Sequence, residues 1–358
     1  MLQRGTDASH SESPPAARTK TGRVSPRSGA VARASSQRTK AAPRAAADKS
    51  ACDVRVELGD AYDLLDTLDP SSIDLLITSP PYWGQRSYGA DHNWSVLSEW
   101  KCAGGQPEQA PPYDWYRGAG GILGLEPFPD WYVAHLVEIL DKCRSRLKST
   151  ASVWVNIGDT YFARWASIRE NGRQGLGNNP RTRRRTPMGD YRQEKQLLMV
   201  PARFAIAMQS RRWILRNDVI WFKPNVPPRP EKDRLRLSHE HFFHFVLRPK
   251  LGRARYFYDL AAVEPRAHDV VEVPVRPGQD GHSATFPEDL IRPRILSSCP
   301  PNGVVLDPFC GTGRTLVVAA ESGRRAIGFD VAKHFVKAAR ESIVAKKPSA
   351  RVRNARRP

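Results

Sequence analysis

Cysteine is scarce in this sequence: five cysteines stand among 358 residues, and no two of them form a Cys-x-x-Cys pair. This pattern excludes a disulfide framework and the usual spacing of a zinc site, so we expect no metal and a reducing, cytoplasmic setting. Long apolar runs and a secretory signal are also missing, which excludes the membrane-spanning and secreted classes. No internal repeat is visible, and no feature specifies an oligomeric state.

Positive charge is in excess. Lysine and arginine number 56 against 37 aspartates and glutamates, which gives a net charge of +19 and a pI near 10.1. Such a balance favours a polyanionic partner, and double-stranded DNA is the natural one. An arginine-rich proteome that raises the pI without any function is the alternative.

Three regions follow from composition. Residues 1–50 are rich in Ser, Ala, Arg and Pro and lack apolar periodicity. We expect a disordered basic arm that loosely holds phosphate, although a plain solvated extension is equally open and a mitochondrial presequence is a weaker option. Residues 51–345 are predicted to form one large α/β domain. The stretch 346–358 is a second basic tail.

Within residues 51–345, apolar strands alternate with amphipathic helices, which indicates a doubly wound, mostly parallel sheet. The predicted strands are 54–58, 73–78, 152–157, 214–222, 241–247, 304–307 and 325–330, and the predicted helices are 61–68, 130–147, 202–209, 287–299, 316–322 and 333–345.

The first functional motif is Ser79-Pro80-Pro81-Tyr82, which directly follows the buried strand 73–78. Prolines cannot extend a strand ladder, so they leave a stiff loop at the carboxyl edge of the sheet, where ligands of open α/β sheets bind. A hydroxyl on one side and an aromatic ring on the other suit a flat ring that carries an amine. A proline-rich turn without function is the plainer alternative.

The second motif is the strand and glycine-containing loop 304–313, with the sequence VVLDPFCGTG. Glycine lets the backbone approach a ligand closely. A further strand ends at Asp330, 17 positions after Gly313, where a carboxylate is well placed to accept hydrogen bonds from ribose hydroxyls. The third glycine of the dinucleotide fingerprint is missing, so NAD binding is possible but less favoured.

Together these motifs resemble the DNA amino-methyltransferases that use S-adenosylmethionine. The catalytic loop precedes the cofactor loop, as in the circularly permuted β class, and the resemblance implies a seven-stranded methyltransferase sheet. Gly59-Asp60 resembles the turn at the cofactor's adenine, and 282–287 resembles the segment that opens the helix before the cofactor strand. The implied cofactor-binding residues are Asp60, Phe286, Asp307, Phe309, Gly311, Thr312, Gly313 and Asp330.

The resemblance also implies the substrate side. Ser79, Pro80, Pro81 and Tyr82 are the implied catalytic residues, with Trp83 as a second stacking ring. The segment 221–225, which contains Lys223 and Asn225, resembles a loop at the substrate edge. Two long stretches, 84–128 and 161–195, are candidate target-recognition insertions, and the second contains Arg181, Arg183, Arg184 and Arg185. Arginine forks suit phosphates and guanine edges, while a solvated basic loop is the alternative.

The implied reaction is methyl transfer to the exocyclic amine of a flipped base, without a covalent enzyme intermediate. Serine before the two prolines is commoner with cytosine N4 and aspartate with adenine N6, so Ser79 favours cytosine. Adenine N6, RNA bases and a protein glutamine amide remain alternatives, as does a non-catalytic DNA-binding protein. A cognate restriction endonuclease is a possible partner.

Overall fold

The computed structural model describes residues 53–84, 92–162, 165–168, 174–175, 183–185, 187–228, 231–263, 268–275, 286–346 and 352–353. The predicted basic arm 1–50, Arg181, residues 282–285 and most of the tail 346–358 lie outside the described residues. The three short ranges 165–168, 174–175 and 183–185, and the pair 352–353, are described only by their backbone.

A nine-stranded sheet forms the centre of the described chain, in the order β12-β1-β11-β10-β2-β3-β8-β7-β9. Only β8 runs antiparallel to its neighbours. The strands are β1 (Val54–Leu58), β2 (Ile73–Thr78), β3 (Leu147–Ile157), β7 (Trp213–Phe222), β8 (His239–Leu247), β9 (Val270–Glu272), β10 (Val304–Asp307), β11 (Arg325–Asp330) and β12 (Val352–Arg353). The mostly parallel α/β fold is confirmed; the short strands β9 and β12 extend the seven expected strands at the two edges.

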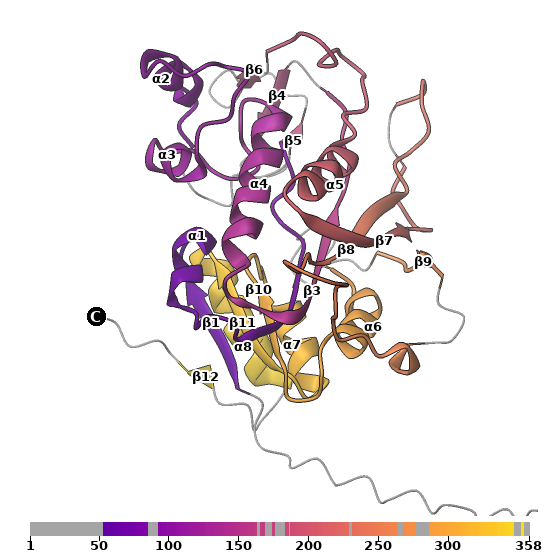
Figure 1. Cartoon of the computed structure of the whole chain (residues 1–358). Coiled ribbons are helices and arrows are strands. Elements are labelled where there is room, and N and C mark those ends of the chain that lie inside the picture. The colour runs from indigo at the N-terminus through magenta and orange to yellow at the C-terminus, as the bar shows by residue number, and fades with distance from the viewer. Residues whose placement is uncertain are drawn as a thin grey trace, which may run out of the picture. The chain divides into compact units, whose positions relative to one another are not determined.

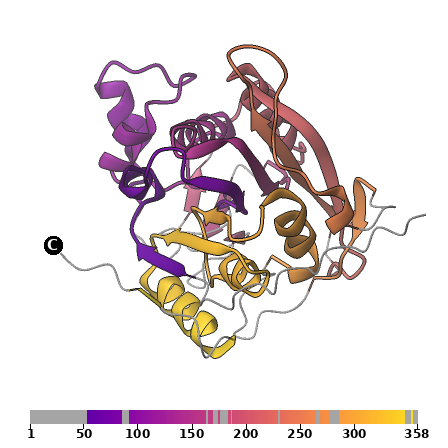
Figure 2. The same cartoon turned by 60° about the horizontal axis from the view of Figure 1, so that its bottom comes forward.

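Helices cover both faces of this sheet (Figure 2). One face packs against α1 (Ala61–Leu64), the short 3-10 helix η1 (Leu65–Thr67), α4 (Pro129–Cys143) and α5 (Val200–Ser210). The other face packs against α6 (Glu288–Ser298), α7 (Arg314–Glu321) and α8 (Lys333–Lys346). A second 3-10 helix, η2 (Leu260–Ala262), precedes α6. Two apolar cores therefore sandwich the sheet, as expected for a doubly wound fold.

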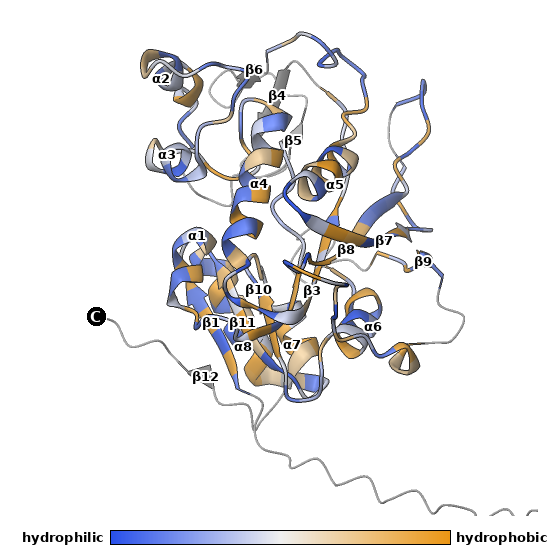
Figure 3. Ribbon diagram, viewed as in Figure 1, coloured by the Kyte–Doolittle hydropathy of each residue, from blue (hydrophilic) through white to orange (hydrophobic). Residues whose placement is uncertain are grey.

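Helix α4 is shorter than predicted. Its apolar spacing suggested a helix as far as Leu147, but the helix ends at Cys143 and Leu147 opens β3. Figure 3 shows hydrophilic and hydrophobic turns along α4, which matches one face packed on the core. The prediction failed at the helix end because an apolar residue fits the core equally well as the last turn of a helix or the first residue of a strand.

The stretch 84–128 is not the long loop that we expected. It contains α2 (Val96–Cys102) and α3 (Tyr113–Gly118), and Val96, Tyr116 and Phe128 lie in the same core as α4. Aromatic residues of this stretch therefore contribute to the core, and its role in target recognition stays a prediction. The helices α2 and α3 are too short for their apolar residues to show a helical period in the sequence.

The second insertion, 161–195, forms a separate three-stranded sheet of β4 (Trp165–Ile168), β5 (Gln174–Gly175) and β6 (Arg183–Arg185). The arginines 183–185 form the backbone of β6, which pairs antiparallel with β4. Their role in target recognition stays a prediction.

Two further statements concern the described residues alone. No helix among them is both long and apolar enough to cross a membrane. Nor do three or more of their His, Cys, Asp and Glu side chains gather where they could hold a metal ion.

Candidate active site

The parallel strands bring both sequence motifs to one edge of the sheet. Strand β10 lies between β11 and β2, and all three run in the same direction (Figure 1). Thr78, the last residue of β2, donates a hydrogen bond of 2.6 Å to Asp307, the last residue of β10, across 229 positions of sequence. Because their carboxyl ends meet at this edge, the Ser-Pro-Pro-Tyr loop and the glycine loop start side by side.

The glycine loop is held by Asp330 at the end of β11. One carboxylate oxygen accepts from the Gly311 N–H at 3.0 Å, and the other accepts from the Ala332 N–H at 2.8 Å. Gly311 adopts φ +52°, and a Cβ built there would meet nothing within 4 Å. The loop therefore leaves open space beside Gly311, next to the Asp330 carboxylate that accepts from its N–H.

Gly313 serves a different purpose from Gly311. It caps α7 with φ +77°, and a Cβ at this position would lie 2.8 Å from the Cβ of Ala339 on α8. Its missing side chain lets the two helices approach, so Gly313 is required for packing. Thr312 lies half-buried between the two glycines.

Three carboxyl groups at this edge have a raised pKa because they are buried. Burial raises the pKa of Asp60 and Asp330, and it raises the pKa of Asp307 to about 6. Ionised carboxyl groups in such surroundings are stabilised by hydrogen-bond donors and by positive charge. These three carboxyl groups therefore fit a ligand that carries hydroxyl or amine donors and a cationic centre.

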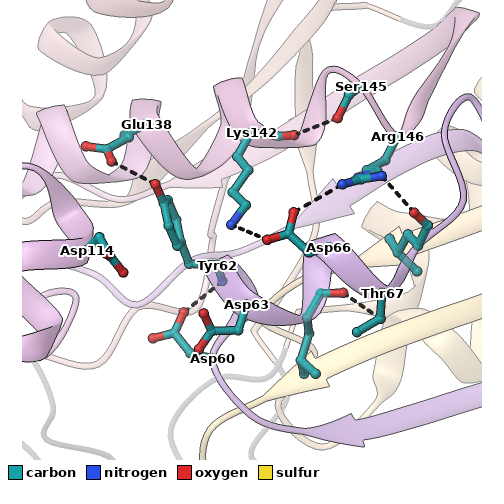
Figure 4. Close-up of polar contacts among 12 residues, drawn as sticks. Asp60, Tyr62, Asp63, Asp66, Thr67, Asp114, Glu138, Lys142, Ser145 and Arg146 are labelled. Atoms are coloured by element: carbon teal, nitrogen blue, oxygen red, sulfur yellow. Dashed lines mark hydrogen bonds and ion pairs between the residues drawn. The ribbon is translucent and has the colours of Figure 1, made fainter.

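Asp60 is fixed from two sides. It caps α1 by accepting from the Tyr62 N–H at 2.8 Å, and it accepts from the Tyr113 hydroxyl at 3.1 Å. The Tyr62 hydroxyl in turn donates to Glu138 of α4 at 3.2 Å, among the polar contacts of Figure 4. The neighbouring Gly59 N–H donates to the Asp330 carbonyl at 3.0 Å, so the turn after β1 that carries Asp60 lies beside the end of β11.

The two predicted aromatic residues of the cofactor side are both partly buried. Phe309 follows β10 and packs against the core that contains α4. Phe286 precedes α6 and meets Phe242 of β8 edge to face, with ring centroids 5.3 Å apart. Each packs against a different one of the two cores.

The catalytic loop carries a chain of hydrogen bonds. The Ser79 hydroxyl donates to the Tyr82 hydroxyl at 3.3 Å, and the Tyr82 hydroxyl donates to Glu240 Oε2 at 2.7 Å. Asn156 Nδ2 donates to the same two oxygens, both at 2.6 Å. Lys223 forms an ion pair with the other carboxylate oxygen of Glu240. Burial and the charge of Glu240 raise the pKa of Tyr82 well above its usual value.

Sequence reasoning missed Glu240, Asn156 and Gly158. Asn156 lies near the carboxyl end of β3, and a polar residue at the end of an otherwise apolar strand could have indicated a site residue. Glu240 lies near the start of β8, and only the antiparallel direction of β8 brings it to this edge. A Cβ at Gly158 would lie 3.0 Å from the Tyr82 ring and 3.2 Å from Glu240, so glycine makes room for their contact.

Trp83 does not occupy the predicted stacking position. Its side chain is only 4% exposed, and its indole N–H donates to the Glu126 carbonyl at 3.0 Å. It therefore anchors the loop in the core, and its bulk was mistaken for a base-binding surface. Lys223 contacts Glu240, while both amide atoms of Asn225 bind the backbone of Val275, at 2.7 and 2.8 Å, and the role of both residues at the substrate stays a prediction.

A buried pair of polar side chains supports the catalytic loop from α4. His135 lies 3.1 Å from a carboxylate oxygen of Glu126 and 3.0 Å from the Pro111 carbonyl, and both side chains are 0% exposed. Both ring nitrogens of His135 therefore have an oxygen partner. The second oxygen of Glu126 accepts from the Gly124 N–H, and the Gly124 carbonyl accepts from the Gly84 N–H at 2.6 Å.

Comparison with known proteins gives concordant matches. The family model for DNA methylases of the N6 and N4 type matches residues 73–341. The type II methyltransferase M.SmaI of Serratia marcescens is 31% identical over 300 residues, which cover 81% of this chain and 90% of the relative. M.Cfr9I of Citrobacter freundii is 32% identical over 286 residues, covering 78% and 83%.

Among solved structures, the PvuII DNA methyltransferase, described as cytosine-N4-specific, superposes with a TM-score of 0.56. The match has 18% sequence identity and covers 83% of this chain and 92% of the PvuII chain. At this identity the likeness supports the fold.

Proposed function

Because the chain belongs to the N6/N4 DNA methylase family, which makes it a DNA amino-methyltransferase that uses S-adenosylmethionine, we propose that it methylates the N4 amine of a flipped cytosine. The observation that carries this proposal is the serine hydroxyl of the Ser-Pro-Pro-Tyr loop, which lies beside the glycine loop and is hydrogen-bonded to Tyr82. The type II names of the relatives favour a restriction-modification role, for which a cognate endonuclease would be the partner.

The proposed cofactor site includes the open space beside Gly311. S-adenosylmethionine supplies a methyl group on a positively charged sulfur. We assign its ribose hydroxyls to Asp330, its adenine to the turn at Asp60, and the stretch Phe309–Gly313 to the rest of the molecule. The buried carboxyl groups favour such a cationic ligand because its charge offsets their cost of ionisation.

The proposed site for the substrate base is the loop after β2. An exocyclic amine is a poor nucleophile because its lone pair is delocalised into the ring. Acceptors on the Ser79 hydroxyl and the Pro80 carbonyl hold the N–H groups and direct the lone pair at the methyl group, which is catalysis by orientation. The Tyr82 ring, held by its hydroxyl, stacks on the base. A base within a duplex cannot reach this edge, so flipping is implied.

Cytosine is favoured over adenine because serine rather than aspartate precedes the two prolines, and in the family that these motifs resemble serine is commoner with cytosine N4. The Ser79 hydroxyl accepts from the amine while its single proton goes to Tyr82, whereas an ionised carboxylate has no proton to donate. Adenine N6 methylation on the same fold is the second candidate. Mass spectrometry of digested DNA from cells that express the protein distinguishes N4-methylcytosine from N6-methyladenine.

Gly311→Ala is expected to weaken S-adenosylmethionine binding at least tenfold, because its Cβ would project into the open space assigned to the cofactor. Gly323→Ala is the matched control: Gly323 also has a positive φ, +76°, and also has nothing within 4 Å of a built Cβ. Both substitutions carry similar backbone strain of about 1 kcal/mol. Calorimetry with S-adenosylmethionine should separate them, and equal affinities would contradict the assignment.

Asp330→Ala is expected to weaken cofactor binding by roughly 1–3 kcal/mol, since hydrogen bonds to the carboxylate are lost. The Gly311 N–H also loses its acceptor, so part of the effect arises from the loop itself. Asp330→Asn keeps one acceptor oxygen, so its affinity for the cofactor should lie between those of the wild-type protein and Asp330→Ala. Unchanged affinity in calorimetry would remove Asp330 from the cofactor site.

A further inference from the structure

The catalytic loop contains a hydrogen-bond chain whose direction has a chemical meaning. Ser79 donates to Tyr82, and Tyr82 donates to Glu240, so each hydroxyl points its proton away from the position of the substrate amine. The chain ends at a carboxylate, the one member that accepts a proton at neutral pH. A serine hydroxyl alone cannot be the final acceptor of the proton that the methylated amine must lose.

We propose that Glu240 is the terminal proton acceptor of the methyl-transfer reaction, reached through Ser79 and Tyr82. This inference rests on the proposed function. As the nitrogen lone pair forms the new N–C bond, the electrons of the broken S–C bond stay on sulfur and the amine becomes cationic. The amine proton passes to Ser79 Oγ, the serine proton to Tyr82, and the tyrosine proton to Glu240 Oε2. Glu240 then releases it to water.

The surroundings of Glu240 suit this role. The charged or titratable groups that contact it are Lys223, just after β7, and Tyr82 from the loop after β2; Asn156 of β3 adds a neutral donor. The side chains of Glu240 and Lys223 are 14% and 13% exposed. The lysine pairs with Oε1 of Glu240 and leaves Oε2 to the Tyr82 hydroxyl.

Tyr82 is suited to be the middle member. Burial and the nearby Glu240 charge disfavour its phenolate, so it stays a neutral hydroxyl that passes a proton only while receiving another. Tyr132 of α4 also bears on Tyr82 electrostatically and acts in the same direction. Asn156 fixes the Tyr82 and Glu240 oxygens relative to one another. The arrangement is therefore a fixed path between the serine and the carboxylate.

The test is the single-turnover methylation rate of the full-length protein with radiolabelled S-adenosylmethionine and unmethylated plasmid DNA, measured in H2O and in D2O. For the wild-type protein the rate should be lower in D2O, because protons move along the path as the amine is methylated. Glu240→Gln keeps an acceptor for Tyr82 but takes up no proton, and it should lower the single-turnover rate about 10²-fold and abolish the difference between H2O and D2O. Binding of cofactor and DNA should change less than threefold.

Two further variants separate a proton path from a structural brace. Tyr82→Phe should be as slow as Glu240→Gln, and the double variant no slower than either. Asp218→Asn is the control: Asp218 pairs with His241 on the same two strands, without contact to the loop, and should keep the wild-type rate.

The outcomes are distinct. A wild-type protein that methylates no DNA would contradict the proposed function. A wild-type protein that methylates DNA while Glu240→Gln does so equally fast would overturn the proton path alone. A slow Glu240→Gln that retains the wild-type solvent isotope effect would also overturn it, since Glu240 would then only hold Tyr82 in place.

Discussion

Ser79→Ala is expected to lower the single-turnover methylation rate by about 10²-fold or more, with little change in cofactor or DNA affinity. The hydroxyl both orients the amine and begins the hydrogen-bond chain to Tyr82, and both interactions matter most as the amine pyramidalises. Alanine removes them without altering the strand, since Ser79 follows β2 and its hydroxyl has no structural partner apart from Tyr82 among the hydrogen bonds described.

Ser145→Ala serves as the control for this substitution, because the Ser145 hydroxyl is exposed and only contacts the Lys142 carbonyl. The rate is measured by transfer of a radiolabelled methyl group to unmethylated DNA, and affinities by calorimetry. Full activity of Ser79→Ala would refute the proposed mechanism. N6-methyladenine as the sole product of the wild-type protein would change the base assignment and leave the role of Ser79 standing.

His135→Ala is expected to lower the free energy of unfolding by about 1–3 kcal/mol, because it removes the buried contacts of the imidazole with Glu126 and the Pro111 carbonyl. The aromatic residues around His135 cannot compensate: Tyr116 lies with its ring centroid 4.6 Å away and Tyr113 at 5.5 Å. Urea denaturation at neutral pH measures the difference. A variant that folds at low temperature should also methylate more slowly, since Glu126 supports Gly124 and, through it, the catalytic loop.

His241→Ala is the matched control for stability. His241 also pairs with a carboxylate, that of Asp218 at 3.0 Å, but their side chains are 25% and 41% exposed. Water screens such a pair, so its loss should cost less than about 1 kcal/mol. Equal destabilisation by the two substitutions would show that burial of the Glu126–His135 pair does not decide its contribution.

The sequence alone determined the two motifs and the seven main strands of the central sheet. Strands β1, β2 and β11 were predicted at their observed bounds, because buried parallel strands are short, apolar and ended by turn residues. The glycine loop and the Ser-Pro-Pro-Tyr loop were found for a similar reason: their chemistry lies in consecutive residues. The resemblance of these two loops to those of DNA amino-methyltransferases identified the family, which the comparisons confirm.

Only the tertiary structure decided which residues complete the site and which do not. Asn156 comes from β3 and Glu240 from β8, and no spacing along the chain links them to Tyr82. Trp83 was wrongly placed at the substrate because a tryptophan beside a functional loop is equally suited to the core. Contacts across a sheet depend on strand order and direction, which are set by packing of the whole domain, whereas a loop motif is fixed by its own backbone.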